Sequence, residues 1–366
     1  MSRRRARRTS ALAAATALVA LVGAGCGSSD SDSGSSASTG STTAAPAGPK
    51  SASIMLEFPA NASQIYWFSG LERGTVTKAG IKAKTVFPDD PSTPVKALAA
   101  GKVDFALQLS TGAMVAKAQG RDVKVIGTLE NLPEGLLVLN DKIKTIADVK
   151  GKTIGLADAT WERACMTREL EKAGLTAKDI KIVNPGANLI TPLLQGKLAG
   201  VNGSQYEQAI IKIAANKESR VIRFSDVCPE TSIQILTTDK MIKDHPDTVK
   251  AMMKALTDSM AWAMANPTEA EAIYAKKYPE QDRKSNLAQW QASIPTFCSK
   301  YSETKGLFYA DPEQYQQLID LTKEAGAIDA SYDVNTLVDN SFITDPPNTT
   351  ACANDLYKAD PMSQIK

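Results

Sequence analysis

Carboxylates and aromatic rings gather in the segments that follow the predicted strands of this chain, and the same segments contain no Lys or Arg. The segments are residues 57–64, 109–112, 130–135, 158–162, 184–191 and 203–207. Their acidic residues are Glu57, Glu130, Glu134, Asp158, Glu162 and Glu207, and the aromatic candidates in or near them are Phe58, Tyr66, Trp67, Trp161 and Tyr206. Carboxylates accept hydrogen bonds from amino groups, and flat rings stack on planar heterocycles. The pattern predicts a site for a neutral or cationic ring that carries amino groups, and it disfavours an anion.

Most weight among the candidate ligand-binding residues falls on Asn61, Gln64, Trp161 and Tyr206, with Glu207 as the polar group that orients the ligand. The full candidate set is Phe58, Asn61, Gln64, Ser110, Thr111, Asn131, Thr160, Trp161, Glu162, Asn188, Tyr206 and Glu207. Other roles stay open for some of the rings and acids. Trp67 can equally belong to the core, and Asp158 and Glu162 can cap the helix that begins beside them.

The elements that must position these residues alternate between short apolar strands and helices from Ser51 onward, which is typical of parallel α/β architecture. Strands are expected at residues 53–58, 103–109, 123–129, 136–139, 153–157, 180–183, 198–202, 221–224 and 233–237, with another ending at 86–87. Helices are expected at 65–73, 92–101, 111–119, 161–172, 190–195, 205–214 and 315–325, and behind Pro246 as far as Asn266. Ligands of parallel α/β sheets bind beyond the carboxyl ends of the strands, which places the candidate segments together.

The first fifty residues have the order of an export signal followed by a tether. Five arginines precede an apolar run from Ala11 to Val22, which is shorter than the roughly 20 residues that span a membrane. Small residues then lead to Cys26, as in a bacterial lipoprotein signal. We expect residues 1–25 to be removed, Cys26 to carry lipid such as palmitate, and residues 26–50 to form a disordered Ser/Thr-rich tether. Ordinary cleavage near this point, which would release a soluble protein, is the alternative.

Composition excludes several classes of function. Of 42 basic residues, removal of the five leader arginines leaves 37 against 40 acidic residues, which argues against nucleic acid as a partner. One histidine, His245, and the lack of any CxxC spacing argue against a metal. No P-loop, Gly-x-Ser-x-Gly or His-Glu-x-x-His motif is present. We therefore expect no enzyme activity and no cofactor.

Four stretches resemble the solute-binding proteins of ABC importers that handle nitrate, sulfonates, taurine and the pyrimidine precursors of thiamine. They are Leu56–Gln64, Val95–Phe105, Ile146–Gly155 and Leu193–Gly203. The resemblance implies the type II periplasmic-binding-protein fold, with two lobes, two hinge crossings near Leu139 and Ile233, and a ligand cleft between the lobes. Residues 51–138 and 233–366 would form lobe 1, and residues 139–232 would form lobe 2.

The resemblance also implies a function. The protein would be a monomeric receptor, anchored outside the cell membrane, that closes on its ligand and delivers it to a permease and an ATPase. A pyrimidine precursor of thiamine is the favoured ligand, an alkanesulfonate, taurine or nitrate is the alternative, and a ligand sensor without a permease is a second one. An enzyme on the same scaffold, as in fungal relatives that make the pyrimidine from their own histidine, is disfavoured because His245 lies far from the cleft segments.

Four cysteines besides Cys26 allow three disulfide pairings in an oxidising compartment. The favoured pairing joins Cys165 to Cys228 and Cys298 to Cys352, because each bond then falls within one implied lobe. Four buried free thiols are the alternative.

Overall fold

The computed structural model describes residues 50–90, 92–132, 135–139, 143–156, 160–184, 189–224, 227–229, 231–343 and 352–366. The predicted leader, Cys26 and the tether lie outside these residues, as do Glu134, Asp158 and Asn188. Within the described residues, no helix combines the length and the apolar character needed to cross a membrane.

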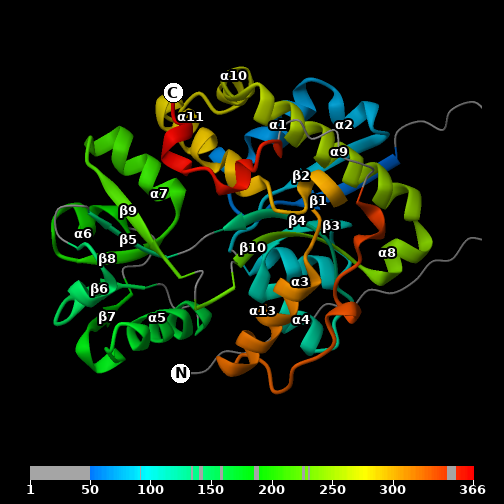
Figure 1. The fold of residues 1–366 in the computed structure, drawn as a ribbon. Helices are drawn as coiled ribbons and strands as arrows, with labels where there is room; N and C mark the ends of the chain where they lie inside the picture. The colour runs from blue at the N-terminus through cyan, green and yellow to red at the C-terminus, as the bar shows by residue number, and fades with distance from the viewer. Residues whose placement is uncertain are drawn as a thin grey trace, which may run out of the picture. The chain divides into compact units, whose positions relative to one another are not determined.

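Two five-stranded sheets form the framework (Figure 1). The first has the order β2-β1-β3-β10-β4, with β1 Lys50–Met55, β2 Ile81–Val86, β3 Phe105–Leu109, β4 Lys124–Leu132 and β10 Thr231–Thr237. The second has the order β7-β6-β8-β5-β9, with β5 Gly135–Leu139, β6 Thr153–Gly155, β7 Lys181–Val183, β8 Gly200–Gly203 and β9 Ser219–Arg223. The strands predicted from sequence are all present, with ends shifted by a few residues.

The strands that connect the sheets run against their neighbours. β10 is antiparallel to both β3 and β4, and β5 is antiparallel to both β8 and β9, whereas the other pairs are parallel. The predicted α/β architecture is confirmed, with two antiparallel strands in otherwise parallel sheets. The chain also enters the second sheet between Leu132 and Gly135, so β5 belongs to the second sheet and not, as expected, to the first up to residue 138. β10, which contains Ile233, belongs to the first sheet.

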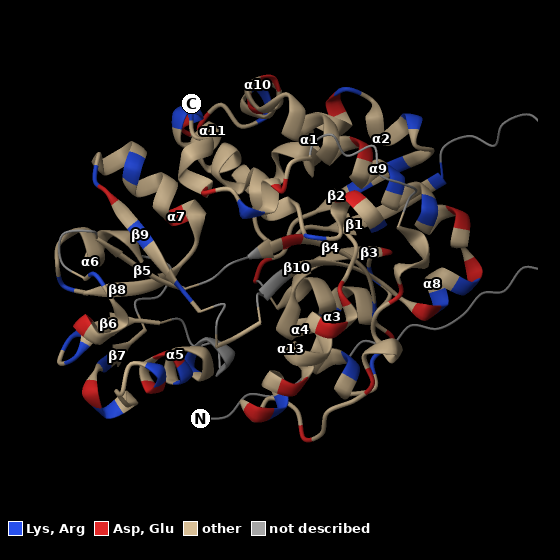
Figure 2. Cartoon of the chain, in the orientation of Figure 1, with Lys and Arg blue, Asp and Glu red and all other residues tan. Residues whose placement is uncertain are grey.

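Thirteen α-helices are present in the described residues. They are α1 Ile65–Glu72, α2 Thr75–Lys78, α3 Thr93–Ala99, α4 Ser110–Ala118, α5 Thr160–Lys172, α6 Ile190–Leu194, α7 Gln205–Ile210, α8 Asp239–Asp244, α9 Pro246–Ala265, α10 Pro267–Lys277, α11 Arg283–Ser293, α12 Ser302–Lys305 and α13 Pro312–Glu324. The helix predicted behind Pro246 is α9, and its methionines are buried in the core as expected. Basic and acidic residues are interspersed along the outer helices (Figure 2).

Alternation along the strands sends neighbouring side chains into different hydrophobic layers. In β1, Ile54 packs in the layer that includes α1 and α9, while Met55 packs in the layer that includes α3, α4 and α13. In β5, Leu136 packs on the α5 side and Leu137 on the α6 side. Each sheet is therefore covered on both faces, as α/β folds require.

The helix that follows the first candidate segment is held very close to its neighbour. A Cβ on Gly70 of α1 would lie 2.0 Å from the Ser259 hydroxyl of α9, so only glycine permits this approach. Both helices contribute buried residues to the main core, such as Trp67 of α1 and Leu256 of α9. The loop that leads into α1 is thus carried by a rigid element.

Two disulfides join Cys165 to Cys228 and Cys298 to Cys352, which confirms the favoured pairing. The first attaches α5 to the segment that leads back to the first sheet. The second attaches the C-terminal residues to the short 3-10 helix Ile294–Phe297.

Candidate functional site

A cavity of about 420 Å³ lies between the loop after β1 and the start of α7, and we call it the Phe58 cavity. From the first sheet and its helices come Phe58, Asn61, Ser63, Leu109, Ile233 and Gln289, and from the second come Leu189, Asn202, Gly203, Ser204, Tyr206 and Glu207. Phe58 and Tyr206 supply aromatic surface. Among these lining residues there is no Lys or Arg, as the sequence predicted for the candidate segments.

Two buried carboxylates lie behind the wall of this cavity, and each is joined to it by one hydroxyl. Ser63 lines the cavity and donates from Oγ to Glu57 Oε1 at 2.9 Å. Tyr206 also lines the cavity, and its hydroxyl lies 3.0 Å from both oxygens of Glu130. Glu57 is 2% exposed and Glu130 is fully buried. Any group that binds to one of these hydroxyls is therefore connected to a buried carboxylate through a single further hydrogen bond.

Glu57 and Glu130 influence each other electrostatically, and with their neighbours they form a group of polar side chains that we call the acidic cluster, made of Glu57, Ser63, Gln64, Tyr66, Glu130, Gln205, Tyr206 and Thr296. Besides Tyr206, Glu130 Oε1 accepts from Gln205 Nε2 at 3.1 Å and from Thr296 Oγ1 at 2.7 Å. Gln64 donates to Glu57 at 3.2 Å. These partners come from α1 and its approach, β4, α7 and the 3-10 helix Ile294–Phe297, so the cluster joins both sheets.

Burial controls the charge of the cluster. It raises the pKa of Glu130 to about 8. The Glu57 carboxylate raises this pKa further, whereas the hydrogen bonds from Thr296 and Tyr206 lower it. Burial likewise raises the pKa of Glu57. The pKa of the Tyr66 hydroxyl is raised well above its usual range by burial first and then by both carboxylates. With no cation among the described cluster residues, both carboxyls keep their protons to a higher pH than they would in water.

The cluster also contains polar atoms that have no partner among the described residues. They are Glu57 Oε2, Gln64 Oε1, Tyr66 OH and Gln205 Oε1. The two amide oxygens, Gln64 Oε1 and Gln205 Oε1, can only accept a hydrogen bond. A buried acceptor that lacks a donor costs free energy, so the cluster is suited to a ligand or to waters that supply N–H or O–H groups.

The predicted site residues divide into several groups. Phe58, Asn61, Tyr206 and Glu207 line the Phe58 cavity. Gln64 lies behind it in the acidic cluster. Ser110 and Thr111 begin α4 and are not among the lining residues. The backbone of Thr160, Trp161 and Glu162 forms the start of α5, but their side chains, like all of Asn188, lie outside the described part of the chain.

Glu207 has a structural role besides its place in the cavity wall. Its Oε2 accepts from the Ser204 backbone N–H at 2.9 Å and from the Ser204 hydroxyl at 2.8 Å, while Ser204 caps the start of α7. This is a capping box, and the Ser-x-x-Glu spacing could have been recognised in the sequence. Trp67 is fully buried in the core, where its ring N–H donates to Thr85 at 2.9 Å.

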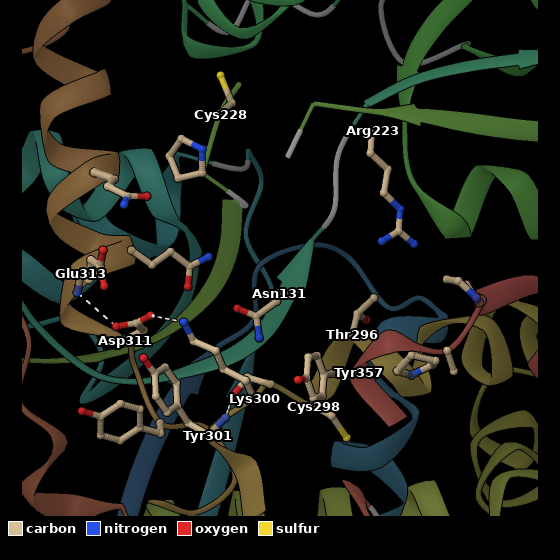
Figure 3. Close-up of a pocket in the computed structure, with 18 residues that line it drawn as sticks. Asn131, Arg223, Cys228, Thr296, Cys298, Lys300, Tyr301, Asp311, Glu313 and Tyr357 are labelled. Atoms are coloured by element: carbon tan, nitrogen blue, oxygen red, sulfur yellow. Dashed lines mark hydrogen bonds and ion pairs between the residues drawn. The ribbon is translucent and has the colours of Figure 1, made fainter. Parts of the chain in front are cut away.

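Asn131 lines a different cavity, also of about 420 Å³, which we call the Tyr301 cavity. Figure 3 shows its charged and aromatic side chains, including Arg223, Lys300, Asp311 and Tyr357. Lys300 lies 3.9 Å from Asp311, so part of its charge is compensated within the wall. Thr296 contributes to this cavity and also contacts Glu130, which places the acidic cluster between the two cavities.

Sequence reasoning did not select Ser63, Gln205 or Thr296, and it noted Glu130 only as one of several acids. Gln205 and Thr296 are 75 and 166 residues from Glu130, and no local pattern links them. Ser63 could have been selected from the sequence, because it lies in the same candidate segment as Asn61.

Comparison with known proteins gives consistent results. Residues 62–270 match a family described as NMT1/THI5 like. A protein of Haemophilus influenzae named for thiamine biosynthesis is 26% identical over 281 residues, covering 75% of this chain and 87% of its own length. A 4-amino-5-hydroxymethyl-2-methylpyrimidine phosphate synthase of Uromyces fabae is 26% identical, with 66% and 75% covered. A formylaminopyrimidine-binding protein of Halalkalibacterium halodurans is 19% identical, with 74% and 84% covered.

Among solved structures, the periplasmic aliphatic sulphonate binding protein SsuA of Escherichia coli superimposes with a TM-score of 0.63 at 18% identity, covering 82% of this chain and 93% of that one. At this identity the likeness concerns the fold. Because the family match spans more than half of the chain, this protein belongs to the NMT1/THI5-like family, and its fold is that of the periplasmic binding proteins.

Proposed function

We propose that this protein is the extracytoplasmic solute-binding component of an ABC importer and that it binds a small heteroaromatic molecule with amino groups, such as a pyrimidine precursor of thiamine. The observation that carries the proposal is the pair of buried carboxylates, Glu57 and Glu130, joined to the Phe58 cavity through Ser63 and Tyr206. The two sheets and their helices would act as lobes that close on the ligand.

The cavity matches an amino-substituted ring in shape and in hydrogen bonding. Phe58 and Tyr206 offer ring faces for stacking, and Asn61 and Glu207 add polar groups at the rim. Ring amino groups would donate to the hydroxyl oxygens of Ser63 and Tyr206. The Tyr206 hydroxyl donates to Glu130, and the Ser63 hydroxyl lies within hydrogen-bond distance of Glu57 and of the Asn61 side-chain oxygen.

An alkanesulfonate, taurine or nitrate is the alternative ligand, and the fold of the sulphonate-binding neighbour is compatible with it. Electrostatics disfavours it, because the described lining residues of the Phe58 cavity include no Lys or Arg that would compensate the charge of an anion. The helix that begins beside the cavity offers no compensation, since Glu207 already occupies the N-terminus of α7.

Isothermal titration decides between the two ligand classes. The protein is titrated with 4-amino-5-hydroxymethyl-2-methylpyrimidine, with its N-formylated amino analogue, and with taurine, an alkanesulfonate and nitrate in separate runs. We expect saturable binding of a pyrimidine and none of the anions. Tight binding of a sulfonate without binding of a pyrimidine would refute the ligand assignment.

We propose binding and not catalysis, although two relatives are named as synthases. The histidine of this chain, His245, lies between α8 and α9 and lines a separate surface hollow with Lys50 and Asp247. It therefore has no route to a ligand in the Phe58 cavity. Mass spectrometry after prolonged incubation with pyridoxal phosphate should show an unmodified chain and no pyrimidine product.

Export and anchoring remain proposals that rest on the leader and on Cys26. Expression in a bacterium should give a membrane-bound chain whose N-terminal residue is an acylated Cys26, and the Cys26→Ser variant should leave the membrane fraction. A permease and an ATPase encoded beside this reading frame would support import, whereas a lone reading frame would favour a ligand sensor.

A further inference from the structure

The last described segment of the chain, residues 352–366, is fastened at both ends, and we call it the C-terminal strap. At its start, Cys352 is bonded to Cys298, directly after the 3-10 helix that presents Thr296 to Glu130. At its end, the backbone N–H of Lys366 donates to Gln291 Oε1 of α11 at 3.1 Å. Both attachments are on the side of the first sheet.

Between these attachments the C-terminal strap contacts a helix of the second sheet. Met362 and Ile365 pack against a small buried group made of Ala209 of α7 and Ala288 and Ala292 of α11. The Met362 carbonyl also accepts from Lys212 Nζ at 3.5 Å. The three alanines let α7 and α11 approach closely, and the strap covers the junction between them.

The helix that the strap covers supplies two members of the acidic cluster. α7 begins with Gln205 and Tyr206, which donate to Glu130, and Ala209 follows Gln205 by one helical turn. α7 has only six residues and continues into one π-helical turn, so its placement depends on tertiary contacts more than on its own stability. A contact at Ala209 thus sets where the Tyr206 hydroxyl lies.

We infer that the C-terminal strap is a positioning element of the binding site, which holds α7 against α11 so that Gln205 and Tyr206 reach Glu130. The strap does not touch the ligand. It raises the fraction of molecules in which the site is assembled, and the apparent affinity for the ligand rises with that fraction. This inference rests on the proposed function only for its effect on affinity, since the effect on α7 is independent of the ligand.

The test compares Met362→Asp with Met362→Leu in the full chain, by hydrogen exchange of the α7 amides and by titration with 4-amino-5-hydroxymethyl-2-methylpyrimidine. Met362→Asp puts a charge against the alanines, whereas Met362→Leu keeps the apolar contact. Lys358→Ala is the matched control, because Lys358 pairs with Asp355 inside the strap at 3.0 Å and both side chains are exposed. Met362→Ala provides a milder change if the aspartate variant does not fold.

We expect α7 amides to exchange about tenfold faster in Met362→Asp with α9 unchanged, the pyrimidine Kd to rise about tenfold, and Met362→Leu and Lys358→Ala to match the parent protein. Unchanged exchange in α7 would overturn the inference, and so would equal acceleration in α7 and α9, which would show a general loss of stability. If the parent protein binds no pyrimidine, the proposed ligand is wrong, and the exchange comparison still decides the role of the strap.

Discussion

The Phe58 cavity and the Tyr301 cavity have the same volume, about 420 Å³, but they differ in how charge is compensated. The Tyr301 cavity contains both signs, and its Lys300 lies beside Asp311 and over the Tyr301 ring. The Phe58 cavity has buried acids behind it and no cation among its described lining residues. Because the charges in the wall of the Tyr301 cavity are paired with each other, they need no ligand to compensate them. A site whose acids keep raised pKa values leaves a role for a ligand that supplies donors.

The largest expected effect comes from Glu130→Gln, which keeps the shape of the side chain but replaces the titratable carboxyl by an amide. One acceptor oxygen of the carboxyl becomes an NH₂ donor that faces the Tyr206 hydroxyl, and pyrimidine binding should weaken by about 1.5–2.7 kcal/mol, or roughly ten- to hundredfold in Kd. Isothermal titration measures this change. Glu313→Gln in the Tyr301 cavity is the matched control and should leave Kd unchanged; equal losses in both variants would end the distinction between the cavities.

The stability of the ligand-free protein should fall as the pH rises from about 5 to 8. In this range the folded protein keeps a proton on Glu130, whose pKa is about 8, while the unfolded chain has released it. Because the unfolded state binds fewer protons, the free energy of unfolding decreases with pH, with a limiting slope of about 1.4 kcal/mol per pH unit for one proton. Glu57, whose pKa is also raised, contributes in the same direction.

Urea unfolding at several pH values measures this slope in the parent protein and in Glu130→Gln. The variant should lose most of the Glu130 contribution, and Glu313→Gln should keep the parent slope. A slope that is the same in all three proteins would show that Glu130 is ionised in the folded state.

A smaller effect is expected from Phe58→Ala, which removes one ring face from the wall of the cavity. Loss of a stacking contact should cost about 1 kcal/mol of binding free energy, or roughly fivefold in Kd, since aromatic pairs contribute about 0.5–1.5 kcal/mol beyond their burial. Tyr301→Ala removes a ring from the other cavity and should not change Kd. If the two variants reverse these results, the ligand binds in the Tyr301 cavity.

The smallest effect is expected from Lys300→Ala. Its partner Asp311 is 3.9 Å away, and the lysine side chain is 59% exposed, so the pair should contribute less than about 1 kcal/mol to the free energy of unfolding. Urea unfolding checks this value, and titration should show an unchanged Kd. A loss of several kcal/mol would mean that the Tyr301 cavity depends on its ion pair for its structure.

Local patterns predicted most of the fold. The strands were predicted from apolar runs and α9 from the helical spacing of the methionines behind Pro246, because each of these patterns is contained in one short segment. The assignment of β5 to the first lobe failed because an apolar run does not specify which sheet it joins. The pairing of the cysteines was correct because it followed from the lobes implied by the resemblance.

The site was less predictable than the fold. Phe58, Asn61 and Tyr206 were found because they follow strands, and strand ends meet at one edge of a sheet. The central role of Glu130 was missed because burial selected it from several similar acids, and its partner Thr296 comes from a distant helix. Glu207 was assigned to the ligand, although its carboxylate is engaged by Ser204.

The close approach at Gly70 has a consequence for how the site can adapt to other molecules. No side chain larger than hydrogen fits between α1 and Ser259, so the loop with Asn61 and Ser63 stands on a helix that cannot shift without disrupting the main core. The opposite wall stands on the short α7. Changes in ligand preference should therefore accumulate in and around α7, with the β1–α1 loop acting as a fixed reference surface.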